Sequence, residues 1–319
     1  MKIGLITSGG DAPGMNACLR AVVRTALGAG HSVVGFERGY EGVVNGWSRI
    51  MDARSVSNIL HTGGTILGTA RCEEIKTSKG VEKAAGVLKD TGVEGLITIG
   101  GDGSAHGALA ISEVAGIPVV LVPATIDNDI WGTDETIGFD TAVNTAMECV
   151  DRIRDTAASF ERIFVVEVMG RRRGFIAQRV GLVTGAEVVL VPEIRYSLDK
   201  VCTTLIEGRK RGKKSSIVIM AEGAGSSRAV AEQIQDVTGY DTRITVLGYV
   251  QRGGIATARS RLLADLFGLH AVRMLEEHCK PLMVGIENNQ IVTHSLSEVI
   301  SNRKELDQMM LSILENFAI

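Results

Sequence analysis

The chain has 319 residues, of which 45% are hydrophobic and 22% are charged, and its formal net charge is −3. This size and balance predict a globular protein with one large or two medium domains, and the small negative charge argues against a broad nucleic-acid surface. Glycine is abundant, with 38 residues, whereas aromatic residues make up only 4%. Aliphatic parallel strands joined by tight turns have this kind of composition.

Short aliphatic runs alternate with amphipathic helical patterns along almost the whole chain. The predicted strands, in chain order, are residues 2–8, 32–36, 93–101, 117–124, 162–170, 186–193, 215–223, 242–250 and 281–292. The predicted helices are residues 15–30, 80–92, 104–116, 139–160, 175–185, 198–212, 228–239 and 259–278. This alternation predicts an α/β protein with mainly parallel sheets covered by helices on both faces, and a second series of elements begins near residue 139.

The cysteines and the apolar runs indicate in which cellular compartment the protein is expected. Five cysteines occur, without a CxxC pair or a zinc-ligand spacing, which predicts a reduced, cytoplasmic protein. The first residues run directly into a predicted strand and a glycine turn, so no signal peptide is expected. No apolar run is long enough to span a bilayer, so no membrane association is expected either.

Two glycine-rich loops, at residues 9–11 and 100–104, follow predicted strands and precede predicted helices. Glycine lets the backbone approach an anion, and a helix N-terminus offers unpaired N–H groups, so both loops are candidate phosphate sites. Tight strand-to-helix turns are the alternative interpretation. Asp102 needs a cation between its carboxylate and a phosphate, which favours Mg²⁺. Neither loop has the spacing of a dinucleotide fingerprint or a Walker A motif.

A third motif, "TIDND" at residues 125–129, follows another predicted strand. The alternate spacing of Asp127 and Asp129 puts both carboxylates on one side of an extended segment. Such a pair can serve a base and a metal site, and turn or capping chemistry is the alternative. Together the three loops predict phosphoryl transfer on a scaffold outside the two commonest nucleotide motifs.

The motifs "TSGGDAPGMNA", "GGTILGTAR", "IGGDGS", "TIDNDI", "VEVMGR", "AEG", "TRITVLG" and "QRGG" occur in that order. Together they closely resemble the bacterial ATP-dependent 6-phosphofructokinase family, over essentially the whole chain. The resemblance implies the phosphofructokinase fold, with two Rossmann-like three-layer domains. It places a larger ATP-binding domain at residues 1–138 and about 252–302, and a smaller fructose-6-phosphate-binding domain at 139–251 and about 303–319.

The family reaction moves the γ-phosphate of ATP to the 1-hydroxyl of fructose 6-phosphate, the committed step of glycolysis, with Mg²⁺ as cofactor. The resemblance makes Asp127 the base for the hydroxyl proton and assigns the metal to Asp102 and Asp129. The catalytic residues that it implies are Asp127, Thr125, Arg71 and Arg171. The implied ATP-binding residues are Gly10, Arg71, Cys72, Gly101, Asp102, Gly103 and Ser104.

The implied sugar-phosphate site contains several arginines, which suit phosphate because a guanidinium binds two oxygens at once. Its residues are Thr125, Ile126, Asp127, Arg162, Met169, Gly170, Arg171, Glu222, Arg243, Tyr249 and Arg252. Arg162, Arg243 and Arg252 each lie at or next to the end of a predicted strand, where ligands of α/β proteins bind. In family tetramers Arg162 and Arg243 reach in from the neighbouring subunit, so a homotetramer is implied.

The resemblance also implies an allosteric site for ADP or phosphoenolpyruvate between subunits. Its residues are Arg20, Arg24, Arg154, Gly185, Glu187, Arg211, Lys213 and Lys214. Arg20 and Arg24 are four residues apart on one predicted helix and therefore share a face. Solvated cations at a helix end are the alternative interpretation of the run "RKRGKK".

Some positions depart from the family pattern. Tyr249 stands where the family usually has His, and a neutral hydrogen bond in place of a charged one is expected to weaken fructose 6-phosphate binding by about 1 kcal/mol. Arg172 and Arg173 add charge near the sugar site. Pyrophosphate-using relatives tend to have Asp where Gly103 stands and Lys where Ala124 stands, so ATP is the expected donor.

Two other functions remain alternatives at this stage. One is a pyrophosphate-dependent phosphofructokinase, or a kinase of the wider superfamily whose members share only "GGDG". The other is a non-catalytic sugar-phosphate sensor on the same scaffold, which would not need Asp127 as a base beside metal ligands.

Overall fold

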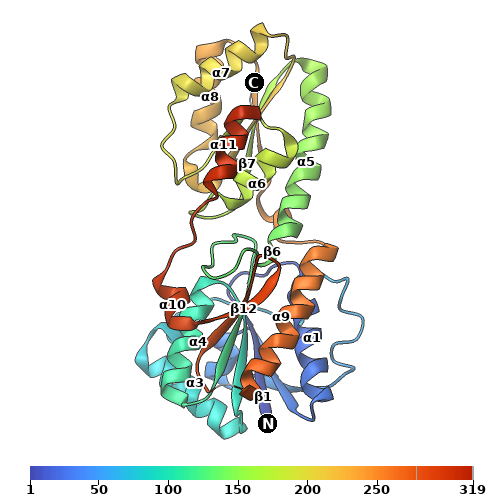
Figure 1. Ribbon diagram of the computed structural model, residues 1–319, viewed down its shortest axis with the longest axis vertical. Coiled ribbons are helices and arrows are strands. Elements are labelled where there is room, and N and C mark those ends of the chain that lie inside the picture. Colours follow the sequence, from blue (N-terminus) through green and yellow to red (C-terminus); the bar gives the residue numbers. More distant parts are fainter. Residues whose placement is uncertain (278, 318–319) are drawn as a thin grey trace. The chain divides into compact units, whose positions relative to one another are not determined.

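The computed structural model describes residues 1–277 and 279–317 (Figure 1). These residues form two compact units. Unit 1 comprises Met1–Thr141 and Arg252–Lys304, and unit 2 comprises Ala142–Gln251 and the chain from Glu305 onwards. The last residue of the predicted helix 259–278 and residues 318–319 of the predicted smaller domain lie outside the described residues.

Unit 1 is built on a sheet whose strand order is β12-β11-β5-β4-β1-β2-β3, with β6 paired to β5. All neighbouring strands are parallel except at the two edges, where β3 and β12 run antiparallel to their partners. The strands are β1 (Lys2–Ser8), β2 (Ser32–Phe36), β3 (Ser48–Met51), β4 (Gly95–Gly100), β5 (Val119–Thr125), β6 (Ile137–Gly138), β11 (Leu282–Glu287) and β12 (Gln290–Ser295). The central strands β1, β4 and β5 are almost fully buried, as expected of parallel strands covered on both faces.

Helices cover both faces of this sheet (Figure 1). Helices α1 and α9 pack against each other, and α9 also contacts β4, β5 and β11. Helices α3 and α4 contact each other over a core cluster that includes Phe36, Leu88 and Ile111. The helices of unit 1 are α1 (Met15–Gly28), α2 (Tyr40–Asn45), η1 (Glu74–Lys76), α3 (Ser78–Thr91), α4 (Asp102–Ala115), α9 (Ala258–Glu277) and α10 (Leu296–Ser301).

Unit 2 has a parallel sheet with the strand order β10-β7-β9-β8. Helices α7 and α8 pack together over a core cluster that includes Val165, Leu205 and Ile234, while α6 and α11 pack on β8. The strands are β7 (Ile163–Val168), β8 (Val188–Leu190), β9 (Ser216–Ala221) and β10 (Thr242–Val246). The helices are α5 (Phe139–Phe160), α6 (Phe175–Thr184), α7 (Leu198–Lys210), η2 (Glu222–Ala224), α8 (Ser227–Thr238), η3 (Gly248–Gln251) and α11 (Gln308–Phe317).

The predicted α/β class with mainly parallel sheets is confirmed. The strand region predicted at 281–292 is confirmed as strand, but the prediction did not divide it into the antiparallel hairpin that β11 and β12 form. Its turn residues Asn288 and Asn289 have φ angles of 50° and 61°, and asparagine tolerates this left-handed conformation better than most residues. The strand predicted at 242–250 ends at Val246, because Gly248, with φ 55°, turns the chain into η3.

Several short elements escaped the sequence prediction, namely α2, β3, β6, α10 and α11. The elements α2, β3, β6 and α10 are too short to show a clear apolar period, and three of the four residues of β3 are exposed. Helix α11 is longer, and the sequence prediction overlooked its apolar pattern. Among the described residues, the five cysteines are free thiols. The same part of the chain contains no helix that is both long and apolar enough to cross a membrane.

Two glycines of helix α3 give a matched test of this packing. A Cβ at Gly80 would lie 1.9 Å from the Glu74 carbonyl oxygen, whereas a Cβ at Gly86 meets nothing within 4 Å among the described residues. Gly86→Ala is therefore expected to stabilise the protein by about 0.5–1 kcal/mol, because alanine favours the helix. Gly80→Ala is expected to destabilise it by about 1–3 kcal/mol, because the backbone must shift. Thermal unfolding of both variants measures the difference, and equal effects would contradict this account of the close approach at Gly80.

Candidate active site

Three loops meet at one edge of the unit 1 sheet. Strands β1, β4 and β5 are neighbours and parallel, so their carboxyl ends lie at the same edge. The Ser104 hydroxyl donates a hydrogen bond to the Ser8 carbonyl oxygen at 3.1 Å, which joins the loops after β4 and β1. A Cβ at Gly101 would lie 3.5 Å from the Thr125 Cβ, so the loops after β4 and β5 are also in contact. The structure thus brings together the three predicted phosphate and carboxylate motifs.

The Tyr40 side chain stabilises the loop that follows β4. Its hydroxyl is buried and donates to the Ser104 carbonyl oxygen at 2.6 Å. Burial raises the pKa of the Tyr40 hydroxyl well above its usual range, so this group remains a neutral donor at physiological pH. The bond fixes the first turn of α4, which carries Asp102 and Gly103.

A loop from residues 62–72 crosses the end of β1 and positions Arg71 and Cys72. The Thr69 hydroxyl donates to the Gly9 carbonyl oxygen at 2.7 Å, and the Thr7 hydroxyl donates to the Gly68 carbonyl oxygen at 2.8 Å. These bonds hold the loop against the first glycine turn. The sequence analysis did not identify the two threonines, because their role depends on this long-range contact.

Gly10 and Arg252 are in direct contact. A Cβ at Gly10 would lie 1.7 Å from Arg252 Nη2, so only glycine permits this approach of the guanidinium. The Arg252 Nε is buried and has no hydrogen-bond partner among the described residues. Since an unsatisfied buried donor is costly, an anion at this position would stabilise the arrangement.

The first turn of α4 faces open space. The Asp102 side chain is 63% exposed, and its Oδ1 lies 4.0 Å from Nε2 of the His106 ring. Nothing in the described part of the chain lies within 4 Å of a Cβ built at Gly103. Ala124, in contrast, is fully buried in β5. The Gly103 position is therefore open, whereas the Ala124 position is closed.

The "TIDND" loop is held in shape by its central residue. Asn128 is buried and has φ 53°. Its Oδ1 accepts the Thr136 N–H at 3.0 Å, and its Nδ2 donates to the Asp134 carbonyl oxygen at 3.1 Å. Asp127 is only 6% exposed, and its N–H donates to the Thr125 hydroxyl at 3.2 Å. The amide of Asn128 therefore holds the backbone of the loop that carries both neighbouring carboxylates, a role that the sequence analysis missed.

The carboxylates of this edge fit a shared metal ion. No cluster of three or more His, Cys, Asp or Glu side chains that could enclose a metal exists in the residues described. Mg²⁺ commonly binds one or two carboxylates together with substrate phosphates and waters, and does not require a protein cage. Asp102 is exposed and Asp129 is half-buried, and the two carboxylates suit that arrangement.

In unit 2, one group of predicted sugar residues follows the carboxyl ends of the strands. Met169, Gly170 and Arg171 come after β7, and Glu222 comes after β9, the neighbouring strand. The Arg171 N–H donates to Glu222 Oε1 at 2.6 Å, which joins the two loops. Arg171 has φ 55°, and the buried Gln251 accepts the Met169 N–H at 3.3 Å. The structure brings these four predicted residues together.

A second group lies at the opposite end of the same sheet. Arg162 immediately precedes β7, and Arg243 is the second residue of β10. Both arginines are at amino ends, so the expectation that they lie where α/β ligands usually bind is wrong. About 20 Å of strand separates Arg162 from Met169, since each strand residue spans about 3.3 Å. One chain therefore cannot bring both groups to the same sugar phosphate.

Asp241 joins the two arginines at this amino end. Its carboxylate lies 2.5 Å from Arg162 Nε and 3.0 Å from Arg243 Nε. The hydrogen bond from Arg162, aided by the charge of Arg243, holds the pKa of the Asp241 carboxyl below its usual range. Sequence analysis missed Asp241, although the alternation of acid and base in "DTR" is a signal that could have found it.

Part of the predicted effector site forms within unit 2. Lys213 Nζ lies 3.5 Å from Glu187 Oε1, and Glu187 Oε2 accepts the Ile217 N–H at 2.6 Å. Arg154 donates to the carbonyl oxygens of Thr184 and Gly185 at 2.7 and 3.3 Å. The side chains of Arg211 and Lys214 are exposed. Arg20 and Arg24 belong to α1 of unit 1, so they form a separate group here.

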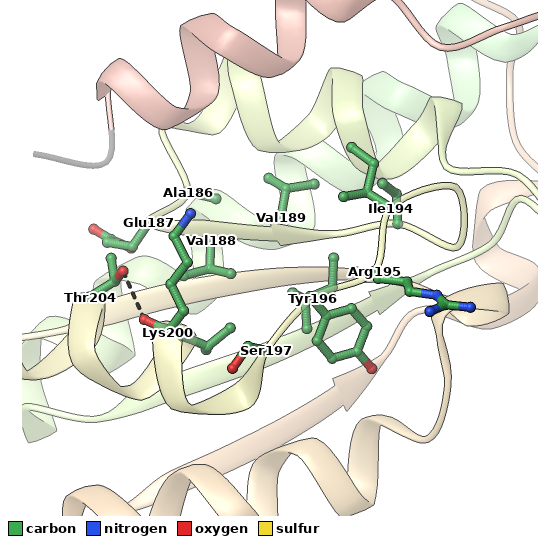
Figure 2. A pocket seen from close by; sticks show the side chains of 13 residues that line it. Ala186, Glu187, Val188, Val189, Ile194, Arg195, Tyr196, Ser197, Lys200 and Thr204 are labelled. Carbon is green, nitrogen blue, oxygen red and sulfur yellow. Dashed lines mark hydrogen bonds between the residues drawn. The ribbon is translucent and has the colours of Figure 1, made fainter.

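Glu187 also lines a pocket of about 410 Å³ between the edge strand β8 and the start of α7. Figure 2 shows Lys200 extending from α7 towards β8. The other lining side chains are mainly aliphatic, including Val188, Val189 and Ile194. The predicted effector residue Glu187 therefore borders a mainly aliphatic pocket.

The departures from the family pattern have different environments. Tyr249 lies in η3 and is 78% exposed. Arg172 is also exposed. Arg173 instead pairs with Glu193 at 3.6 Å and lies over the Phe175 ring, so it stabilises the loop after β7.

Three glycine-rich or acidic loops at the carboxyl edge of a parallel sheet are typical of proteins that bind nucleotide phosphates. A family model described as Phosphofructokinase matches residues 2–275. The ATP-dependent 6-phosphofructokinase of Clostridium tetani is 51% identical to the chain, with 98% of each sequence covered. That of Halalkalibacterium halodurans is 49% identical, with 100% of the chain and 99% of the relative covered. The chain belongs to the phosphofructokinase family.

Solved structures agree on the fold. A phosphofructokinase from Saccharomyces cerevisiae superposes with a TM-score of 0.90 at 35% identity, covering 99% of this chain and 47% of the yeast chain. The chain thus spans about half the length of that neighbour. A pyrophosphate-dependent phosphofructokinase from Marinobacter aquaeolei superposes with a TM-score of 0.85 at 24% identity, covering 100% of this chain and 92% of the other. That second likeness concerns the fold alone.

Proposed function

We propose that the chain transfers the γ-phosphate of ATP to the 1-hydroxyl of fructose 6-phosphate and so acts in glycolysis in the cytoplasm. The full-length identity of about 50% to ATP-dependent 6-phosphofructokinases supports the reaction. The observation that carries the site is the meeting of three loops, after β1, β4 and β5, at one sheet edge. In this proposal unit 1 binds ATP and unit 2 binds the sugar phosphate.

Asp127 acts as the base. Its buried position favours a short contact with a substrate hydroxyl, and Asn128 fixes the loop that carries it. As the bond to phosphorus forms, the 1-hydroxyl passes its proton to the Asp127 carboxylate. Thr125, at the end of β5, contacts the transferring phosphate. Ile126 lies between Thr125 and Asp127 in the sequence. Arg71 and Arg171 neutralise charge that develops on the phosphoryl oxygens.

The donor lies against the glycine loops. Gly10, Gly101, Gly103 and Ser104 let the backbone approach the phosphates of ATP, and Arg71 and Cys72 flank them. Asp102 and Asp129 would hold Mg²⁺, which would supply positive charge to the β- and γ-phosphates.

The sugar phosphate requires more than one subunit. Met169, Gly170, Arg171 and Glu222 contact the sugar of their own chain, together with Arg252 and Tyr249. Arg162 and Arg243 bind the 6-phosphate of a neighbouring subunit in a homotetramer. The separation of these two groups at opposite ends of the unit 2 sheet supports this division.

Asp127→Asn tests the base. The variant should still bind fructose 6-phosphate but lose about 10²–10⁴-fold in kcat, because asparagine cannot take the proton. Steady-state kinetics and calorimetric binding of the sugar phosphate measure the two effects. Asp90→Asn, on the exposed surface of α3, is the matched control and should retain full activity. A wild-type protein that binds the sugar phosphate without turnover would instead indicate a sensor.

Donor choice is a separate test, since pyrophosphate-dependent enzymes share the fold. MgATP should support faster turnover than pyrophosphate at matched concentrations. Gly103→Asp is expected to lower kcat/KM for MgATP by about tenfold or more, because its carboxylate would face the donor phosphates. Gly103→Ala is the control and should be tolerated, since its Cβ meets open space. Faster turnover with pyrophosphate would refute the ATP assignment.

ADP and phosphoenolpyruvate are the proposed effectors. Arg154, Gly185, Glu187 and Lys213 form one cationic cluster around a buried carboxylate, which supports binding of a nucleotide phosphate with its metal ion. Arg211 and Lys214 add positive charge beside it, and Arg20 and Arg24 contribute from a neighbouring subunit.

Arg211→Ala and Lys214→Ala should each weaken effector binding by about tenfold, because a charge-assisted hydrogen bond is lost. The effect is measured as the effector concentration that half-maximally changes the fructose 6-phosphate response. Lys210→Ala, an exposed cation in the last turn of α7, is the control and should leave the response unchanged. Equal behaviour of all three variants would rule out this site.

A further inference from the structure

One carboxylate contacts both arginines at the amino end of the unit 2 sheet. Asp241 Oδ2 accepts a hydrogen bond from Arg162 Nε at 2.5 Å. Asp241 Oδ1 lies 3.0 Å from Arg243 Nε, and Oδ2 accepts from Arg243 Nη2 at 3.3 Å. The two guanidinium groups are therefore held on either side of a single anion.

Backbone pairing fixes this arrangement. The Ile163 N–H donates to the Asp241 carbonyl oxygen at 3.1 Å, and β10 then pairs with β7 in parallel register. Asp241 is thereby placed beside Arg162, two residues before Arg243. The Arg162 guanidinium also lies over the Phe160 ring, with its Cζ 4.3 Å from the ring centroid. Arg162 is thus restrained by an anion and by an aromatic ring.

The contacts leave one edge of each guanidinium for a ligand. Asp241 engages Nε of Arg162 and both Nε and Nη2 of Arg243, which leaves the edge of each guanidinium that carries Nη1 to bind another anion. The Arg162 side chain is 26% exposed and the Arg243 side chain is 55% exposed, so both are accessible to solvent. Two guanidinium groups this close would repel each other without the intervening carboxylate. The lowered pKa of Asp241 keeps that carboxylate ionised at neutral pH.

We propose that Asp241 is a positioning residue that holds Arg162 and Arg243 as a preformed clamp for the phosphate group of the sugar substrate. The inference rests on the proposed function, because that function supplies the phosphate. Asp241 itself does not touch the substrate. It reduces the repulsion between the arginines and the side-chain entropy that they lose when the phosphate binds.

The opposite role is competition, in which the Asp241 carboxylate occupies the guanidinium groups and the phosphate must displace it. The two roles predict opposite changes in KM for fructose 6-phosphate. Removal of the charge raises KM for fructose 6-phosphate if Asp241 positions the arginines, and lowers it if Asp241 competes. This geometry favours positioning, since the carboxylate binds Nε of Arg162 and the Nε–Nη2 edge of Arg243 and leaves the Nη1 side of each guanidinium for the phosphate.

Asp241→Asn is compared with Asp241→Glu and with Asp236→Asn, an exposed substitution on α8 of the same unit. Asp241→Asn should raise KM for fructose 6-phosphate by about fivefold or more, with KM for MgATP and kcat changed less than about twofold. Asp241→Glu should restore much of the affinity, and Asp236→Asn should behave as wild type. Direct binding of fructose 6-phosphate without ATP should weaken by the same factor as KM rises. Asp241→Ser replaces the Asn variant if the latter does not fold.

A KM for fructose 6-phosphate that stays unchanged or falls in Asp241→Asn would overturn the inference, as would a loss confined to kcat. Absence of turnover in the wild-type protein would overturn the proposed function, and it would be seen before any variant is compared. The two failures are therefore distinguishable.

Discussion

The common direction of parallel strands decides where this chain can bind its ligands. In unit 1, β1, β4 and β5 run side by side, so their carboxyl ends bring Gly10, Asp102 and Asp127 to one edge although these residues are far apart in sequence. In unit 2 the same polarity separates two groups of residues that the proposed function assigns to one sugar phosphate. Met169 and Arg162 flank one strand, and its length keeps them at opposite ends.

This separation is the physical argument for the proposed assembly. The predicted sugar residues at the carboxyl end of the unit 2 sheet form one group, and Arg162 and Arg243 at the amino end form a second group. The cluster of Glu187 and Lys213 lies just before β8 and β9, at the same amino end. The residues proposed to bind the effector and the arginines proposed to bind the phosphate therefore share one end of the sheet. Arg209 lies between them, since it donates to the Glu161 carbonyl oxygen at 2.9 Å and to that of Lys213 at 3.4 Å.

The arrangement at both edges depends on supporting residues whose roles the motifs did not identify. Asp241 holds two cations at the amino edge of unit 2. In unit 1, the amide of Asn128 holds the backbone of the loop that carries two carboxylates, without adding charge of its own. Tyr40 fixes the first turn of α4 through a buried hydroxyl. These residues support neighbours that carry the chemistry, and such support keeps a site rigid before substrate arrives.

The sequence by itself determined the α/β class, most long strands and helices, and the motifs that identify the family. Apolar periodicity and glycine turns are local signals, so they can be read from neighbouring residues. It did not reveal the hairpin at Asn288, the short elements or the supporting roles of Thr69, Asn128 and Asp241. Those of Thr69 and Asp241 depend on hydrogen bonds between segments far apart in the chain, that of Asn128 depends on bonds within a folded loop, and the hairpin depends on a turn whose strands must first pair. Only the tertiary structure decided that Arg162 and Arg243 lie at amino ends, because strand polarity within a sheet is set by which strands become neighbours.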